Sequence, residues 1–568
     1  MKFDFFVSIG YRDIFDDYES ADIKVLIVDI PTINSLEIIA YFLAQLHTAE
    51  RDPLLQIEFL RTWVNRLPES IHDKINDFII RITAKSRAEY NFLNNVSALF
   101  LIEILIENAN ILDRLDNLTP AQELNLFKAY LICSQKWIDK QLTNTIVGKI
   151  ANEEDLVKIL IPTQLPFQEI LELKDFRLQI IKAIYFFKFC ESDDQFKDYL
   201  QIFLKEYNLD TWQRYLFNLI TLYTRKFEKL KTPFWVYVPN EFPDATSFLQ
   251  LLTVDTNSFV KSEDFLNLRE KPIYRVDYNN FIILNLNFLV DKLYQGIQFD
   301  LARVLVKNSA TFKGKKIKST VDFMGIFGEY FSETGLFYSV MEYAFEHSTY
   351  KKLKGSEIKE YISDGEPDFY MRDKSKIYLF EFKNIYISSI TKNSYNYEQI
   401  HSEIFKKLVA NQEGSPKGVT QLVNSIIKLR KGEFNKIDNY DFENTTIYPI
   451  IVYVDFSFNL SGMNYILNRE FQKQIKSNNI ENIENIKDLI LIDLDTFIKF
   501  QDLFRNKILR INNCLNEYSN FTKTSKDLYV KLTTFNIFIH YKTRQLNYDS
   551  PKMLHDEVLK MIQHVQNK

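Results

Sequence analysis

Glycine and proline are scarce in this chain, whose 568 residues include only 13 glycines and 14 prolines. In average proteins these two residues together make up roughly 12%. Collagen-like, low-complexity and linker-dominated chains need them to keep the backbone extended or flexible, so the composition excludes such designs. Nine of the 13 glycines fall within residues 314–432. We therefore expect the sharpest bends and the closest backbone approaches in that part of the chain.

Cysteine is rare too, and no long apolar run occurs. Cys133, Cys190 and Cys514 lie far apart and match no metal-ligand spacing, which favours reduced, buried thiols. Residues 1–4, Met-Lys-Phe-Asp, do not open a signal peptide. The most apolar stretch, residues 96–106, contains a glutamate and is too short to span a bilayer. These absences predict a soluble, cytoplasmic protein with no membrane partner.

Neither sign of charge dominates, since the net charge is −5. The whole molecule is therefore not a general binder of polyanions, and any basic surface must be local. With 46% hydrophobic and 15% aromatic residues, the chain can bury a large core and is not intrinsically disordered. Its length favours about three to four domains.

The first half of the chain is expected to contain two regions. Residues 1–232 have mostly helical spacing, and Thr119, Pro120 and Gln122 form the pattern of a helix start with a capping box. Residues 233–318 form a mixed connecting region with a basic segment. Its expected elements are a strand at 234–238, a hairpin with strands at 273–276 and 281–284, and a helix at 287–306.

The second half is expected to contain a compact α/β module at residues 319–495 and a mainly helical region at 496–568. Within the module the order is helix, two strands, helices and two strands. The predicted strands are 368–371, 376–383, 447–455 and 489–494. The predicted fold is thus multidomain, with a mainly α N-terminal region and an α/β core built on a mixed central sheet.

The residues that indicate chemistry lie on the first two strands of this module. Gly365-Glu366-Pro367-Asp368 leads into one strand, and the next contains Glu381 and Lys383. Strand side chains alternate between faces, so Glu381 and Lys383 share a face, and a hairpin would bring Asp368 beside Glu381. Two carboxylates and a lysine suit Mg²⁺, which makes a bound water a stronger nucleophile and neutralises charge on the phosphate. The lysine can orient the water or stabilise that charge.

The combination of a Pro-Asp entry, a hairpin-length gap and a strand with Glu381 and Lys383 on one face is informative, whereas a Glu-x-Lys triplet alone is not. Glu-x-Lys also occurs at residues 172–174 and 357–359, in helical sequence without an upstream Pro-Asp strand. The alternative interpretation is an ordinary hairpin with a surface Glu/Lys pair, which adds modest stability to a sheet.

Asp368, Glu381 and Lys383 together resemble the PD-(D/E)xK nuclease superfamily, which has the restriction-endonuclease-like fold. The resemblance covers about residues 319–495. It implies that Asp368 and Glu381 bind Mg²⁺, with Mn²⁺ as a possible substitute, that Phe382 contributes its backbone carbonyl, and that Lys383 is the catalytic lysine. Family members often have a further acid on the preceding helix, for which Glu329 is favoured and Glu333 is second.

The helix that starts at Gly418 is similar to the family's polar helix behind the active site. The resemblance implies that Gln421 assists the site or meets the DNA backbone. Recombination-type members often have a tyrosine four residues later, whereas this chain has Ser425. His401, in a helix expected at about 398–409, is given no role.

A basic segment immediately precedes the module. Residues 301–321 contain no acid, and Lys313, Lys315, Lys316 and Lys318 lie within them. Lysines beside a phosphate-cleaving site would bind nucleic-acid backbone independently of sequence. A solvated loop is the alternative. The chain has no P-loop, no G-x-G-x-x-G fingerprint and no zinc-finger spacing.

The favoured hypothesis is a Mg²⁺-dependent nuclease that hydrolyses phosphodiester bonds, with DNA favoured over RNA as the substrate. Family members with large extra domains commonly serve in restriction or phage defence. One alternative is a non-cleaving nucleic-acid-binding or scaffold protein with a nuclease-like fold. Another is a nuclease subunit that stays inactive until a partner protein or phage component docks on the helical region.

Overall fold

The structure is a computed structural model. It describes residues 8–18, 21–49, 52–85, 92–110, 112–143, 150–225, 232–262, 264–362, 365–478 and 483–566. Residues 1–4, considered above for a signal peptide, lie outside these ranges. Within them, no helix combines the length and the apolar character needed to cross a membrane. Cys133, Cys190 and Cys514 are buried free thiols.

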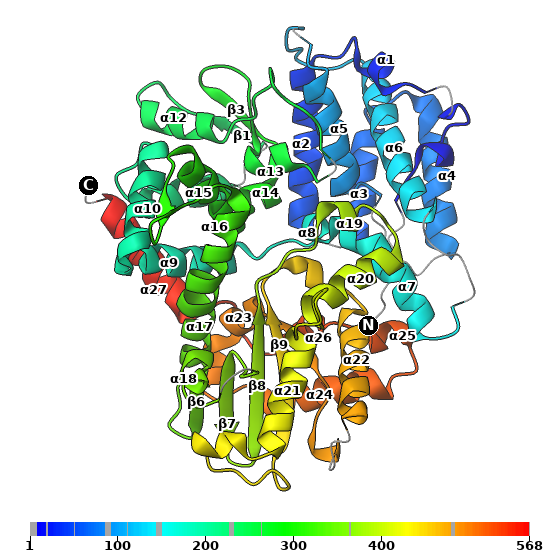
Figure 1. The fold of residues 1–568 in the computed structure, drawn as a ribbon. Coiled ribbons are helices and arrows are strands. Elements are labelled where there is room, and N and C mark those ends of the chain that lie inside the picture. The colour runs from blue at the N-terminus through cyan, green and yellow to red at the C-terminus, as the bar shows by residue number, and fades with distance from the viewer. Residues whose placement is uncertain are drawn as a thin grey trace.

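The N-terminal region is helical, as predicted, and Figure 1 shows its first helices as a bundle at one end of the molecule. Thr119 and Gln122 form the predicted capping box: the Thr119 amide donates to Gln122 Oε1 at 3.0 Å, and the Gln122 amide donates to Thr119 Oγ1 at 3.3 Å. The helices are α1 (Ile23–Ile27), α2 (Thr32–Ala49), α3 (Pro53–Val64), α4 (Glu69–Lys85), α5 (Asn95–Glu107), α6 (Pro120–Thr143), α7 (Glu153–Gln164), α8 (Gln168–Leu171), α9 (Phe176–Ser192), α10 (Asp194–Glu206) and α11 (Trp212–Thr224).

The next region contains the predicted strand and hairpin, which form a three-stranded sheet in the order β1-β3-β2. The single helix predicted at 287–306 is wrong, because the chain breaks it into two. The break lets the buried Lys292 pair with Asp300 at 2.5 Å and donate to the Glu270 carbonyl at 2.9 Å. The elements are β1 (Trp235–Tyr237), α12 (Pro243–Leu251), α13 (Leu266–Glu270), β2 (Ile273–Arg275), β3 (Asn280–Ile283), α14 (Leu286–Asp291), α15 (Gln295–Lys307), β4 (Thr311–Phe312) and β5 (Lys315–Lys316).

A mixed five-stranded sheet follows, in the order β10-β9-β8-β7-β6. The pairs β6–β7 and β7–β8 are antiparallel, whereas β8–β9 and β9–β10 are parallel. The four predicted strands are confirmed to within two residues. The edge strand β6 was not predicted, because its sequence Tyr-Lys-Lys-Leu-Lys has the charged character of an exposed edge. The strands are β6 (Tyr350–Lys354), β7 (Phe369–Asp373), β8 (Lys376–Lys383), β9 (Thr446–Tyr453) and β10 (Ile490–Asp493).

A continuous helical segment precedes this sheet. It consists of α16 (Thr320–Phe327), a π-helix η5 (Gly328–Phe337) and α17 (Tyr338–Ala344). In a π-helix the hydrogen bonds join residues five apart, and the Tyr338 amide donates to the Glu333 carbonyl in this way. The sequence predicted an α-helix here, so the π winding is a correction to that prediction.

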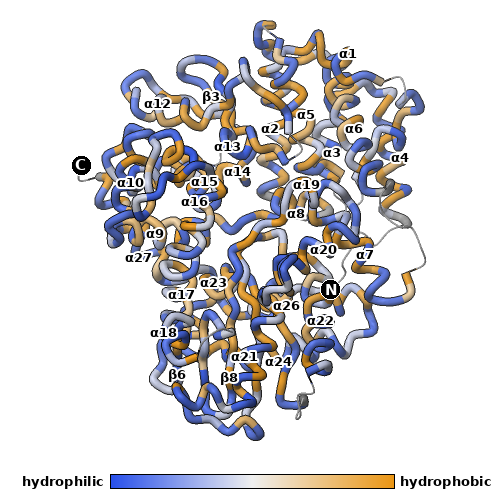
Figure 2. The backbone as a smooth tube through the Cα atoms, in the orientation of Figure 1, coloured by the Kyte–Doolittle hydropathy of each residue, from blue (hydrophilic) through white to orange (hydrophobic). Residues whose placement is uncertain are grey.

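Helices cover both faces of the sheet (Figure 1). Phe369, Phe380 and Phe382 point to the face covered by α17 and α23, whereas Tyr370 and Leu379 point to the face covered by α20, α21 and α22. The remaining helices are α18 (Gly355–Lys359), α19 (Ser389–Lys392), α20 (Tyr397–Leu408), α21 (Gly418–Arg430), α22 (Met463–Ser477), α23 (Leu494–Arg505), α24 (Ile511–Thr524), α25 (Leu528–Lys531), α26 (Phe535–Thr543) and α27 (Lys552–Gln566). Figure 2 shows hydrophobic positions distributed through helices and strands alike.

Glu103 provides a test of the helical region. It lies on α5, is buried, and accepts a hydrogen bond from the Ser262 amide at 3.2 Å. Burial raises the pKa of its carboxyl from 4.5 to about 8. Between these values the folded chain keeps a proton that the unfolded chain loses, so wild-type stability falls as pH rises.

We predict that Glu103→Gln abolishes the fall in stability that the wild type shows as pH rises. The variant should gain stability over the wild type as pH rises from about 4.5 to about 8, by at most about 1.4 kcal/mol per pH unit. Chemical denaturation at several pH values across this range measures the difference. A gain that is constant with pH would contradict the buried, protonated state of Glu103.

Candidate active site

The β7–β8 hairpin brings Asp368 and Glu381 together. Phe369 pairs with Phe380 across the two strands, so Asp368 and Glu381, the next residues along, lie opposite each other on the other face. The Phe382 amide donates to Asp368 Oδ2 at 2.7 Å. The main chain of Phe382 therefore lies directly beside the Asp368 carboxylate.

Lys383 completes the cluster on the same face. Its Nζ lies 2.6 Å from Glu381 Oε1, and the Glu381 side chain is 0% exposed. The second oxygen of Glu381, Oε2, is buried and has no hydrogen-bond partner in the structure. Glu381 is thus a buried carboxylate held by a single cation, with one oxygen left available.

The electrostatics of the three groups are coupled. Burial and the nearby Asp368 charge raise the pKa of Glu381 to about 8, against the opposing effect of Lys383. Burial also raises the pKa of Asp368, with the Lys383 cation opposing it. Burial lowers the pKa of Lys383, but the charges of Glu381 and Asp368 outweigh it, so the pKa rises overall and the side chain stays an ammonium ion. The two carboxyl groups of the cluster therefore keep their protons to higher pH than isolated side chains do.

The structure brings Glu333 to this cluster, and not Glu329. Burial raises the pKa of Glu333, and the Asp368 charge raises it further. The Tyr338 hydroxyl donates to Glu333 Oε1 at 2.7 Å, which pairs residues five apart as the π winding allows. Glu329 is exposed on the same segment. Sequence reasoning missed Tyr338 because α-helical spacing places neighbours three or four residues apart.

Gln421 lies on the face of α21 that covers the cluster. A Cβ atom at Gly418 would lie 3.6 Å from Lys383 Cε, and the Ser425 hydroxyl donates to the Gly365 carbonyl at 2.8 Å. Residues 418, 421 and 425 share one helix face, so Gln421 is positioned between these two contacts. Gln421 Oε1 is buried without a partner, as is Oε2 of Glu366. Glu366 is a further acid that the sequence analysis did not single out, and its charge raises the pKa of Asp368.

Glycines fix the approach of the chain to this cluster. The Gly355 amide donates to the Asp368 carbonyl at 2.8 Å, and a Cβ atom at Gly355 would lie 3.2 Å from the Asp368 backbone. Gly365 has a φ of +80°, in the left-handed region that favours glycine. The expected close approaches among residues 314–432 are found only in part, because a Cβ atom at Gly314, Gly325 or Gly414 would meet nothing within 4 Å, whereas Gly10 and Gly462, outside this range, are closely approached.

The donor set fits a hard divalent cation in part. Among the residues that the structure describes, no group of three or more His, Cys, Asp or Glu side chains forms a metal site unaided. Mg²⁺, however, usually takes only one or two carboxylates and keeps several waters. Asp368 and Glu381, with the unpartnered Glu381 Oε2, supply that number.

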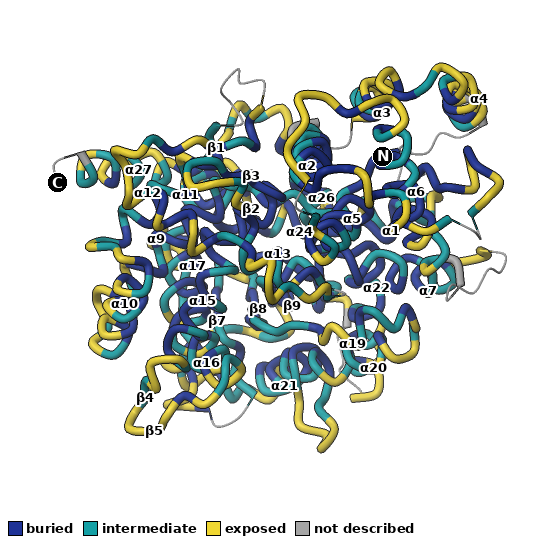
Figure 3. The backbone as a smooth tube through the Cα atoms, turned by 90° about the horizontal axis from the view of Figure 1, so that it is seen from above, coloured by how far each residue is buried: buried dark blue, intermediate teal, exposed yellow. Residues whose placement is uncertain are grey.

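The predicted lysines lie on the β4–β5 hairpin, at the periphery of the molecule and ahead of α16 (Figure 3). Lys313 and Gly314 form its two-residue turn, and both have positive φ, as a type I′ turn requires. Lys313 lies over the ring of Tyr330, 4.8 Å from its centroid. Lys313, Lys315, Lys316 and Lys318 are all exposed. Arg303 and Lys307, by contrast, pair with acids.

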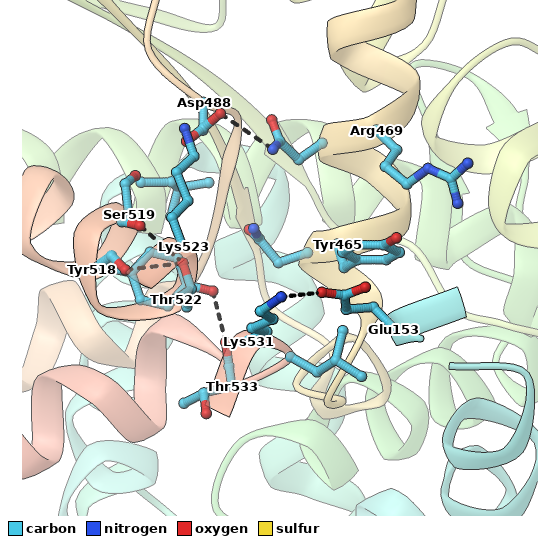
Figure 4. A pocket seen from close by; sticks show the side chains of 14 residues that line it. Glu153, Tyr465, Arg469, Asp488, Tyr518, Ser519, Thr522, Lys523, Lys531 and Thr533 are labelled. Carbon is cyan, nitrogen blue, oxygen red and sulfur yellow. Dashed lines mark hydrogen bonds and ion pairs between the residues drawn. The ribbon is translucent and has the colours of Figure 1, made fainter. Parts of the chain in front are cut away.

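A separate hollow of about 290 Å³ lies between α7, β10, α22, α24 and α25 (Figure 4). None of the predicted site residues lines it. Its lysines are already paired, Lys523 with Asp488 and Lys531 with Glu153, each at 2.5 Å. The hollow is therefore distinct from the carboxylate–lysine cluster.

Comparisons of this chain with models of protein families, with curated proteins and with solved structures find no match. The functional argument therefore depends on the geometry of the cluster.

We predict that Asp368→Asn raises the free energy of unfolding at neutral pH in the presence of EDTA. A raised pKa means that ionised Asp368 costs stability as pH rises through that pKa, and asparagine removes the charge while it keeps an acceptor for the Phe382 amide. Chemical denaturation measures the change. Asp373→Asn, at the other end of β7 opposite Lys376, is the matched control and should give no gain. A destabilised Asp368→Asn would contradict the charge repulsion described here.

Proposed function

We propose that this protein is a Mg²⁺-dependent nuclease that hydrolyses phosphodiester bonds, with DNA as the favoured substrate. The observation that carries the proposal is the convergence of Asp368, Glu381 and Lys383 on one face of the hairpin, with Glu381 Oε2 buried and unpartnered. Buried like charges are costly, and a cation that binds both carboxylates would offset that cost.

Each residue then has a distinct role. Asp368 and Glu381, with the backbone carbonyl of Phe382, would hold Mg²⁺. The bound cation supplies a water of lowered pKa and neutralises charge on the phosphate. Lys383 stays an ammonium ion because the two carboxylates raise its pKa, so it orients the attacking water and stabilises phosphate charge and does not act as a base. Glu333 is the additional acid from the preceding helix, and Gln421 borders the site.

The sheet supports a restriction-endonuclease-like core. Strands β6, β7 and β8 form an antiparallel meander, β9 and β10 continue it in parallel, and helices cover both faces. Asp368 and Glu381 lie where β7 begins and β8 ends. We infer that these strands and residues 319–495 as a whole form the catalytic module.

The complete burial of Glu381 favours one variant of this function, a nuclease that a partner opens. With Glu381 0% exposed, a phosphodiester reaches it only if a covering element such as α21 or η5 moves. A partner protein or phage component that docks on the helical region would supply this movement, which is consistent with a role in restriction or anti-phage defence. Cleavage that appears only with such a partner would support this variant.

We predict Mg²⁺-dependent cleavage that requires the cluster. Purified protein is incubated with plasmid, linear and single-stranded DNA and with RNA, in Mg²⁺ or EDTA. Wild type should cleave DNA only with metal, and Asp368→Asn and Lys383→Ala should lose about 10²-fold or more in rate, as expected when a preorganised charge is removed. Mg²⁺ should also raise the unfolding midpoint of wild type more than that of Asp368→Asn.

The matched control is Lys359→Ala, in the second Glu-x-Lys sequence, where Lys359 is exposed on α18. This variant should cleave like wild type. Equal cleavage by wild type and Asp368→Asn would overturn the site. Absence of both cleavage and any Mg²⁺-induced shift would favour the non-cleaving binding protein.

We predict that the lysine hairpin contributes affinity for nucleic-acid backbone. Lys315→Ala and Lys316→Ala should each weaken DNA binding uniformly across sequences, and should reduce the slope of log K against log salt by about 0.7–0.9, the value for one lost phosphate contact. Fluorescence anisotropy in EDTA at several salt concentrations measures both. Lys24→Ala, an exposed lysine on α1, far from the β4–β5 hairpin (Figure 3), is the control. Equal salt slopes in all three variants would refute a contact at the hairpin.

A further inference from the structure

One carboxylate in the helical region holds the two chain segments that leave the central strands. Glu169 lies on the short helix α8 and is buried, with 5% of its side chain exposed. Its Oε1 accepts from Lys392 Nζ at 2.6 Å and from the Ser457 hydroxyl at 2.9 Å, and its Oε2 lies 2.6 Å from Arg269 Nη1. Lys392 follows β8, Ser457 follows β9, and Arg269 lies on α13. Four parts of the chain thus meet at Glu169.

The chain that leaves β8 is fixed at three successive points. Directly after Lys383, the Asn384 amide group donates to the Ser332 hydroxyl on η5 at 2.9 Å. The Tyr386 hydroxyl then donates to Gln298 Oε1 on α15 at 3.3 Å, and Lys392 ends the segment at Glu169. All three anchors lie outside the sheet. Among these three contacts, only the one between Lys392 and Glu169 is an ion pair.

The chain that leaves β9 is held by the same short helix. Besides the Ser457–Glu169 bond, the Gln168 side chain donates to the Asn459 carbonyl at 3.0 Å, and the Asn459 amide donates to Glu172 Oε1 at 3.1 Å. Because β9 pairs with β8 along its whole length, with Lys383 opposite Tyr453, its exit determines where the end of β8 lies.

The charges in this contact depend on each other. Burial alone would raise the pKa of Glu169, but the cations of Lys392, Arg269 and Lys174 outweigh it, and the pKa lies well below its usual range. The carboxylate is therefore ionised at neutral pH and has two cationic partners, the buried Lys392 and the partly buried Arg269. Removal of its charge leaves Lys392 with the Asp455 charge and Arg269 with the Asp291 and Asp264 charges as compensation, so the two cations move toward those carboxylates or water.

We propose that Glu169 is a positioning residue for the site of the proposed nuclease. It acts through Lys392 and Ser457 to fix the ends of β8 and β9, and so the placement of Glu381 and Lys383. The expected effect of Glu169 on catalysis rests on the proposed function. The expected effect of Glu169 on the positions of the strand ends does not. The helical region thereby becomes part of the support of the site.

The experiment compares Glu169→Gln, Lys392→Met and Ser457→Ala with wild type in the full chain. Hydrogen exchange followed by mass spectrometry should show faster exchange at residues 384–396 and 454–460, largest for Glu169→Gln. For DNA cleavage with Mg²⁺, kcat should fall by up to about 10²-fold, the loss expected for a displacement of about 1 Å. KM should not change, because the lysine hairpin is untouched.

The matched control is Glu103→Gln, another buried carboxylate of the helical region, which contacts neither segment. This variant should leave kcat and the hydrogen-exchange rates of both segments at their wild-type values. Lys392→Met keeps the Glu169–Arg269 pair. It tests the same positioning role if Glu169→Gln fails to fold.

The possible outcomes separate this inference from the proposed function. Unchanged exchange in both segments, or faster local exchange with wild-type kcat, would overturn the positioning role. A uniform rise in exchange across the protein would also overturn it, since that result reports a structural contact alone. If wild type neither cleaves any substrate nor gains unfolding midpoint from Mg²⁺, the proposed function fails, and the exchange data still decide whether Glu169 fixes the strand ends.

Discussion

The placement of two carboxylates beside each other under the surface is the constraint on which the candidate site depends. The Asp368 charge raises the cost of ionising Glu381 and the Glu366 charge raises that of Asp368, whereas Lys383 and, for Asp368, the Phe382 amide oppose this. Such an arrangement is unfavourable for folding, because buried charges are stable only when they are paired and hydrogen-bonded. A protein that keeps it needs a rigid frame, and the frame here consists of the hairpin register, the Phe382 amide and the close packing of α21.

Local sequence was sufficient to predict the hairpin and the cluster. Period-two alternation in residues 376–383 and the Pro-Asp entry determine which side chains share a face, and this information lies within about twenty residues. The same holds for the capping box at Thr119. In each case the competing structures differ in local backbone preferences that the residues themselves express.

Features that depend on distant partners were not predicted. The helix break after Asp291 follows from the pairing of Lys292 with Asp300 and the Glu270 carbonyl. The pairing of Tyr338 with Glu333, five residues earlier, follows from the π winding of residues 328–337, which no local sequence pattern predicts. Strand β6 is held by β7 despite three lysines in five residues. Tertiary context overrides local propensity at each of these positions.

Buried ion pairs join the helical region to the connecting region and to segments beside the sheet, and this has a consequence for how the protein can change shape. Besides Glu169, three buried lysines pair with acids there or nearby: Lys174 with Asp291, Lys182 with Asp495, and Lys292 with Asp300. Apolar surfaces slide at little cost, whereas a buried ion pair is favourable in one geometry and costly in others. A movement of the helical region would therefore be transmitted to the strand ends in discrete steps, since each ion pair is either made or broken.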